Sequence, residues 1–366
     1  MNDRERFLNF CEFKTVDRPP RWEWSFRDDT TALWRAQGLP PEVPGKISWR
    51  DYFMLDSGEP WMAGGMPVDD GINLDPDPPD DAIISENEST LTRKNKWGAT
   101  VVELKIGESI PQYVDFAVQN RRDFRRVVRR WNPADPGRYP ADWARRMAAW
   151  KKRDWPMRIR VYGWYFILRE LMGVTGASMM FYDDPELVDE ICEFWTDFLI
   201  AALDRALADN PFDYVMMWED LAFKNGPLLS PAFFSKHIAG PCTRFISHCR
   251  SRGISHFMVD SDGDIGSIMP LWIDAGVDIL GPFEVAAGMD VVKIGRRHPQ
   301  LIMTGGIDKM QLARGPAAIR AEVDRRVKPL RDRGGYIPSL DHSTIPELTL
   351  SDYRYYREYI LSVTEP

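Results

Sequence analysis

The chain has 366 residues, of which 44% are hydrophobic and 28% charged, and its formal net charge is −8. This composition is typical of a globular protein with a sizeable core, and the negative charge argues against binding to nucleic acid. No apolar run reaches the length of about 18 residues that a transmembrane helix needs, and the charged N-terminus lacks the apolar core of a signal peptide. The four cysteines show no CxxC spacing, so we expect a cytoplasmic protein with reduced cysteines and no membrane contact.

The first part of the chain contains two expected strands, 20–24 ("PRWEW") and 52–56 ("YFMLD"). The following segment, 57–140, departs from any regular pattern and begins with a loop rich in Pro and Asp. Within it, "STLTRKNKWGATVVELK" predicts a β-hairpin whose turn lies at 95–98. The basic cluster at 121–130 is typical of a solvated helix face.

From residue 157 onward, short apolar runs alternate with amphipathic helices. Strands are expected at 157–163, 213–220, 255–260, 277–282, 301–306 and 335–340. The intervening helices are expected to begin at Asp184-Pro185 and Ser230-Pro231, and to cover about 264–275 and 316–333. Strands that alternate with helices in this way predict an α/β protein with a parallel sheet, closed as a (β/α)8 TIM barrel. The 57–140 segment would be an insertion over one mouth of that barrel.

Acidic residues follow the fourth to eighth expected strands. They are Glu219, Asp220, Asp260, Asp262, Glu284, Asp308 and Asp341, and His342 follows the last of them. Any one of these carboxylates alone can be explained as a helix cap. Active sites of such barrels lie at the carboxyl ends of the strands, so the repeated pattern indicates a shared site. Carboxylates gathered there must be protonated, paired with a cation or bound to a metal.

Several segments resemble the uroporphyrinogen decarboxylase superfamily. They include "RERFLNFCEFKTVDRPPRWEW", "VDSDGDIGSIMPLWIDAGVDILGPFEVAAGMD", "MTGGIDK" and "YIPSLDHSTIP". The resemblance implies one distorted (β/α)8 TIM-barrel domain over residues 1–366. Members of the superfamily are either porphyrinogen decarboxylases or zinc-dependent methyltransferases that serve corrinoid proteins.

The resemblance favours the methyltransferase branch. The arginine-rich "RQAGR" motif of the decarboxylases is replaced by "WSFRDD", which leaves only Arg27, and an acidic rim would repel a polycarboxylate porphyrinogen. Where methyltransferases carry His-x-Cys after the fifth strand and Cys after the eighth, this chain carries Asp260, Asp262 and His342. With Glu284, these donors would bind zinc.

The resulting hypothesis is a metal-dependent methyltransferase that moves a methyl group between a small methylated substrate or a thiol and a corrinoid protein. Catalytic roles are expected for Asp260, Glu219 and His342. Substrate contacts are expected from Trp24, Arg27, Trp164, Tyr165, Lys224 and Asn225. The corrinoid would be carried by a separate protein, since the sequence lacks the DxHxxG pattern of corrinoid binding. Two alternatives stay open: a decarboxylase-like lyase that acts on another acid, and a small-molecule binder without catalysis.

Overall fold

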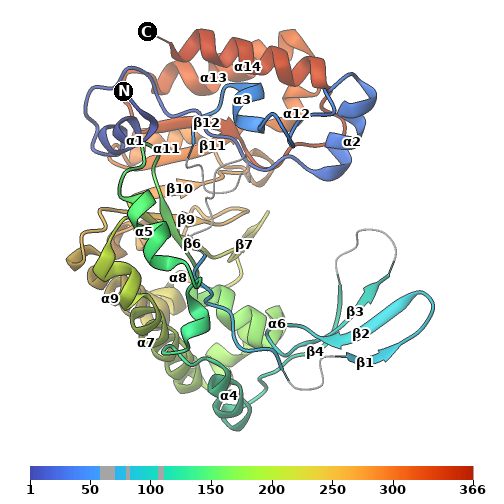
Figure 1. Ribbon diagram of the computed structural model, residues 1–366, viewed down its shortest axis with the longest axis vertical. Coiled ribbons are helices and arrows are strands. Elements are labelled where there is room, and N and C mark those ends of the chain that lie inside the picture. Colours follow the sequence, from blue (N-terminus) through green and yellow to red (C-terminus); the bar gives the residue numbers. More distant parts are fainter. Residues whose placement is uncertain (58–70, 80–82, 106–110, 366) are drawn as a thin grey trace.

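The protein is built around a parallel β-sheet, seen in the computed structural model of Figure 1, which describes residues 1–57, 71–79, 83–105 and 111–365. The strands lie in the order β12-β11-β10-β9-β6-β5, and all neighbouring pairs run parallel. They are β5 (Arg158–Tyr162), β6 (Tyr214–Trp218), β9 (His256–Asp260), β10 (Ile279–Gly281), β11 (Ile302–Ile307) and β12 (Tyr336–Leu340). The strands predicted between residues 157 and 340 are thereby confirmed.

Helices connect these strands and cover the outside of the sheet (Figure 1). They are α6 (Trp164–Asp183), α7 (Pro185–Asp209), α8 (Pro231–Phe233), the π-helix η3 (Phe234–Ile238), α9 (Ala239–Ser251), α10 (Met269–Ala275), η4 (Val285–Ala287), α11 (Val291–Arg297), α12 (Lys309–Leu312), α13 (Pro316–Val327), η5 (Lys328–Leu330) and α14 (Leu350–Thr364). As predicted, Asp184 caps α7, accepting a 3.0 Å hydrogen bond from the Leu187 N–H. In the described part of the chain, no helix combines the length and apolar character needed to cross a membrane.

Before β5 the chain contains several helices. It forms α1 (Asp3–Cys11), α2 (Asp28–Ala36), α3 (Trp49–Phe53), α4 (Arg121–Val127), η1 (Val128–Arg130), η2 (Pro136–Arg138) and α5 (Trp143–Trp150). The strand predicted at 52–56 is wrong, because Tyr52 and Phe53 lie in α3. That helix begins after Ser48, whose hydroxyl accepts a 3.1 Å hydrogen bond from the Asp51 N–H. Trp49 and Phe53 stack with ring centroids 5.7 Å apart, so the apolar residues here follow helical spacing.

The segment 20–24, also predicted as a strand, is extended but has no assigned ladder pairing. It runs beside β12, because the Leu340 N–H donates to the Glu23 carboxylate at 2.8 Å. The two tryptophans of segment 20–24 lie in a buried cluster. The same cluster contains two phenylalanines of α1 and residues from β6, β9, β10, β11 and β12. The cluster comprises Phe7, Phe10, Cys11, Trp22, Trp24, Tyr214, Met216, Met258, Ile279, Ile302 and Ile337. Side chains from so many neighbouring strands meet only if the sheet curls around them, as in a barrel.

The segment between α3 and α4 carries a separate antiparallel sheet with the order β1-β2-β3-β4, which projects beside α6 in Figure 1. Its strands are β1 (Ile83–Glu86), β2 (Thr90–Lys94), β3 (Thr100–Leu104) and β4 (Gln112–Asp115). The predicted hairpin is confirmed as β2 and β3. In the turn between them, Lys96 reaches the carboxyl end of β5 and bonds the Tyr162 hydroxyl at 3.0 Å. Parts of the expected 57–140 insertion (58–70, 80–82 and 106–110) lie outside the described residues.

Candidate functional site

A small acidic cavity lies where β6, β9 and β12 end. Strand register places Asp260 of β9 opposite Trp218 of β6 and Gly281 of β10, so the ends of these strands are level. The cavity has a volume of about 160 Å³. It is lined by Trp24, Ser25, Trp218, Asp220, Asp260, Asp262, His342 and Ser343. Three of the residues expected at a metal or catalytic centre (Asp260, Asp262 and His342) therefore share one cavity.

Asp260 is the most deeply buried acid of this cavity, with 5% of its surface exposed. Burial raises the pKa of its carboxyl well above the ordinary value, and the charges of Asp220, Asp262 and Glu284 raise that pKa further. Among the described residues, no donor forms a hydrogen bond with its side chain. A carboxylate in this position is stable only if it is protonated or if a positive ligand binds beside it.

Asp262 and His342 form a pair across the mouth of the cavity. The His342 Nε2 lies 3.3 Å from the Asp262 Oδ2, and both side chains are partly exposed. The hydrogen bond that the His342 imidazole donates to Asp262 raises the pKa of the ring, although burial opposes this shift. At neutral pH the ring therefore carries a proton more readily than a free histidine.

The turn after β9 is fixed by Gly263, which has a φ of +80°. A Cβ at this position would lie 2.7–2.8 Å from backbone atoms of Ala222 and Phe223, so only glycine fits. The Gly263 N–H donates a 2.9 Å hydrogen bond to the Glu284 carboxylate. Glu284, expected as a metal ligand, thus holds the backbone of the turn.

Asp220 is a cavity residue that the sequence hypothesis passed over in favour of Glu219. Its carboxylate accepts a 2.7 Å hydrogen bond from the Trp218 indole N–H. Burial and the nearby charge of Asp262 raise its pKa, and Arg169 opposes this. Asp220 has a φ of +43°, so the chain leaves the extended conformation there, a turn that residue spacing alone does not reveal.

Glu219 lies behind the strand end, beneath the start of α6. Its carboxylate accepts a 3.1 Å hydrogen bond from the Phe166 N–H, and a Cβ on Gly163 would come within 1.8 Å of it. Burial raises its pKa to about 7. Glu219 does not line the cavity, so the structure gives it a role in positioning α6 rather than contact with a substrate there.

The residues expected to contact the substrate lie in different parts of the structure. Of these residues, only Trp24 lines the cavity. Arg27 is exposed and its guanidinium lies 2.6 Å from Asp29. Trp164 is buried in α6, where its indole N–H donates to Thr196 at 2.9 Å, and the neighbouring Tyr165 is fully buried. Lys224 and Asn225 are exposed in the turn between β7 (Ala222–Phe223) and β8 (Gly226–Pro227).

The expected zinc ligands do not assemble a metal centre in this arrangement. Within the described ranges, no three His, Cys, Asp or Glu side chains gather as a metal-binding group. Asp262 and His342 bond each other, and Glu284 bonds Gly263. A tetrahedral zinc site needs three or four donors directed at one point, so the residues as placed do not fit one.

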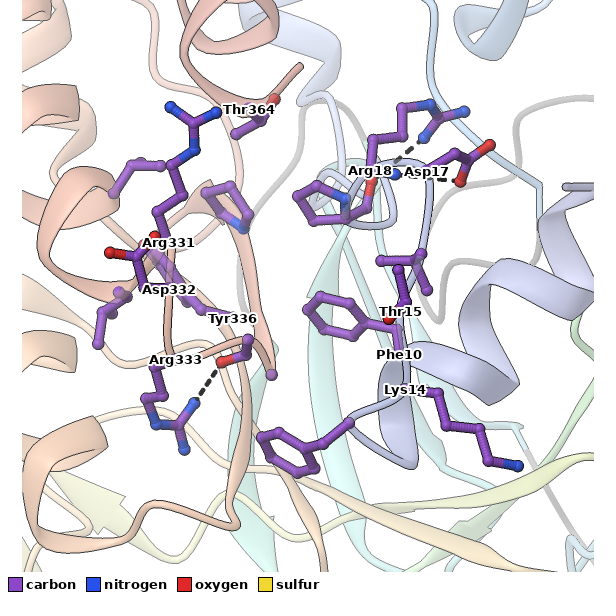
Figure 2. Close-up of a pocket in the computed structure, with 18 residues that line it drawn as sticks. Phe10, Lys14, Thr15, Asp17, Arg18, Arg331, Asp332, Arg333, Tyr336 and Thr364 are labelled. Carbon is purple, nitrogen blue, oxygen red and sulfur yellow. Dashed lines mark hydrogen bonds between the residues drawn. The ribbon is translucent and has the colours of Figure 1, made fainter. Parts of the chain in front are cut away.

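A larger cavity, of about 370 Å³, lies at the opposite end of the strands. Figure 2 shows one wall from Phe10, Lys14 and Arg18 and the other from Arg331 and Tyr336, at the start of β12. Arg18 is already paired with Asp56 at 2.6 Å. Because catalytic groups of such barrels lie at the carboxyl ends of the strands, the acidic cavity is the candidate site despite its smaller size.

The family model for uroporphyrinogen decarboxylase (URO-D) matches residues 113–360, so the chain belongs to that family. A solved methyltransferase from Methanosarcina mazei is similar to the chain at 16% identity, with a TM-score of 0.56 and coverage of 98% of this chain and 99% of that one. A B12-independent methionine synthase from Shewanella sp. W3-18-1 gives 12% identity and a TM-score of 0.37 over 59% of this chain and 64% of that one, which supports no conclusion. Curated proteins give no match.

The family match and the similarity to the Methanosarcina structure define the class of the fold. Together with the curled parallel sheet, they confirm the expected distorted (β/α)8 barrel, although the described residues place six strands in its hydrogen-bonded sheet. At 16% identity the likeness to the Methanosarcina structure concerns the fold alone.

Replacing Glu219 by Gln is expected to change how stability depends on pH. The pKa of Glu219 rises from 4.5 to about 7 on folding, so its contribution favours folding most below pH 4.5 and weakens until the pH passes about 7. Gln does not titrate. The unfolding free energy of Glu219→Gln relative to wild type should therefore rise by roughly 3 kcal/mol across that window.

Urea unfolding at pH 4.5 and pH 8, followed by tryptophan fluorescence, measures this difference. The exposed Glu358→Gln serves as the control. An offset between Glu219→Gln and wild type that is the same at both pH values would contradict the raised pKa.

Proposed function

We propose that this chain is a methyltransferase that acts on a small molecule bound in the acidic cavity. The observation that carries the proposal is Asp260, a buried carboxyl to which no described residue donates a hydrogen bond, beside the Asp262–His342 pair and two tryptophans. The methyltransferase from Methanosarcina mazei shares the fold over 98% of this chain, so the fold is compatible with this class of reaction.

The chemistry of methyl transfer suits negative charge at this position. A methyl group is transferred most readily from an atom that bears positive charge, because that atom leaves with the electron pair of the broken bond. Asp260 and Asp220 would attract this charge and hold the methyl-bearing atom in place in the cavity. The charge either arrives as a proton from His342 or resides permanently on the substrate.

The second reactant in this proposal is a corrinoid carried by a separate protein, as in the methyltransferase branch that the sequence resembles. A corrinoid supplies a strong nucleophile for methyl groups. The residues of this chain bind the small molecule, hold its methyl-bearing atom against Asp260 and keep Asp262 in place through His342. Glu219 takes part as a positioning residue, because its hydrogen bond to Phe166 fixes α6 against the end of β6.

Replacing Asp260 by Asn should remove most of the methyl-transfer activity. The amide keeps the shape of the side chain but not its charge, and we expect kcat/KM to fall by about 10²-fold or more. The assay follows transfer from a panel of methylated compounds to reduced free cobalamin by its absorbance change. Asp264→Asn is the matched control, since Asp264 lies in the same turn, does not line the cavity, and its carboxylate accepts a hydrogen bond from the Gly266 N–H. Near-wild-type rates in a folded Asp260→Asn protein would contradict the proposal.

The family name raises decarboxylation as the competing function. We expect no decarboxylation of uroporphyrinogen by the purified protein, because the cavity carries carboxylates and Arg27 is bound to Asp29 outside it. Product analysis after anaerobic incubation with uroporphyrinogen checks this. Coproporphyrinogen formed at an enzymatic rate would support the lyase instead.

The zinc binding that the sequence led us to expect can be tested by a separate measurement. Because the donors do not converge, we expect little zinc to remain in wild type or in His342→Ala after dialysis against a weak chelator. Elemental analysis measures the retained metal. Stoichiometric zinc in wild type that is lost in His342→Ala would restore Asp260, Asp262, Glu284 and His342 as a metal centre and make the transferase metal-dependent.

A further inference from the structure

The positive groups of the described residues near the acidic cavity are already occupied by other partners. His342 is paired with Asp262 at 3.3 Å, and Lys309 lies 3.3 Å from Asp341. Arg169 uses its guanidinium to donate a 3.0 Å hydrogen bond to the Asp220 carbonyl oxygen, and it stays 4.0 Å from the Asp220 carboxylate. None of these three groups is paired with Asp260 in the described part of the chain.

The burial of the Asp260 side chain is independent evidence that the cavity binds a ligand. With 5% of its surface exposed it is more than nine-tenths buried, it lines the cavity, and no described residue donates a hydrogen bond to its side chain. An ionised carboxylate buried in this way costs several kcal/mol unless a positive group lies beside it. The ionised form of Asp260 therefore requires a positive group that a bound ligand can supply.

Two aromatic side chains complete the lining, Trp24 and Trp218. Trp218 belongs to an aromatic group at the ends of β5 and β6, with its ring 4.9 Å from Phe166 and 6.1 Å from Tyr162. Aromatic rings attract cations whose charge is spread over methyl groups, since such cations lose little hydration on binding. A metal ion would instead need several oxygen or nitrogen donors directed at one point, and no three such donors of the described residues converge.

The size of the cavity limits the ligand. Its volume of about 160 Å³ has room for a compact molecule only. A cation with about five non-hydrogen atoms, such as tetramethylammonium, matches this space. A porphyrin does not.

We propose that the cavity binds a small methylated onium ion, a quaternary ammonium or tertiary sulfonium compound, with its positive centre beside Asp260. This inference rests on the proposed methyl transfer and names the class of its substrate. In the reaction the C–N or C–S bond breaks and its electron pair stays on nitrogen or sulfur, which leaves a neutral amine or thioether. The electron pair of the acceptor forms the new bond to the methyl carbon, so the leaving atom requires neither a proton nor a metal.

Isothermal titration calorimetry with tetramethylammonium chloride tests the proposal on the full chain. tert-Butanol, which has the same number of non-hydrogen atoms and no charge, is the control ligand. We expect saturable binding of tetramethylammonium and none of tert-butanol. Asp260→Asn should weaken the binding at least about tenfold, as should Trp218→Leu, whereas Asp264→Asn should not change it. Circular dichroism confirms that each variant is folded.

Absence of saturable tetramethylammonium binding to the folded wild type would overturn the inference. Equal binding of tert-butanol, or unchanged binding by Asp260→Asn, would overturn it as well. The proposed function fails separately. Methyl transfer from a neutral methyl ether, without onium binding, would contradict this inference and leave the proposed function intact. Onium binding without any methyl transfer would support the ligand class and contradict the proposed function.

Discussion

A carboxyl group buried without a positive partner is the constraint that gives this structure its chemistry. Asp260 lies at the end of a central strand, and its closest charged neighbours, Asp220, Asp262 and Glu284, are all negative. Exposed side chains would avoid this repulsion by turning toward water. Here the strand and its neighbours prevent that, so the site stays ready for a ligand that brings positive charge.

The surrounding turns make this arrangement rigid. Glu284 bonds the Gly263 backbone, and Asp341 accepts hydrogen bonds from the Val285 N–H at 3.0 Å and the Lys309 N–H at 3.2 Å. The carboxylates after β10 and β12 thus tie together the loops that follow β9, β10, β11 and β12. Several acids at the strand ends therefore serve the backbone, and a smaller set faces the cavity. This division explains why acidic residues recur around the rim although no metal cluster forms among the described residues.

The sequence predicted the strands from β5 to β12 and the shared site at their ends, because alternating strands and helices and acids at strand ends are local patterns. It did not predict α6. Its apolar residues surround the whole helix, so no helical face stands out, and Trp164 and Tyr165 were interpreted as rim residues. The choice of Glu219 over Asp220 missed the turn at Asp220, where a φ of +43° accompanies the hydrogen bond from Trp218. Whether four donors converge on one metal depends on side-chain directions, which residue spacing does not reveal.

A crystal of the wild-type protein soaked in tetramethylarsonium, the arsenic analogue of tetramethylammonium, tests the central claim most directly. Anomalous scattering at the arsenic edge locates the positive centre without ambiguity. The account predicts one strong peak in the cavity, beside the Asp260 carboxylate and within about 6 Å of the centre of the Trp218 ring. A fully soaked crystal without a peak in this cavity, or with a metal ion bound to Asp260, Asp262 and His342 in its place, would contradict it.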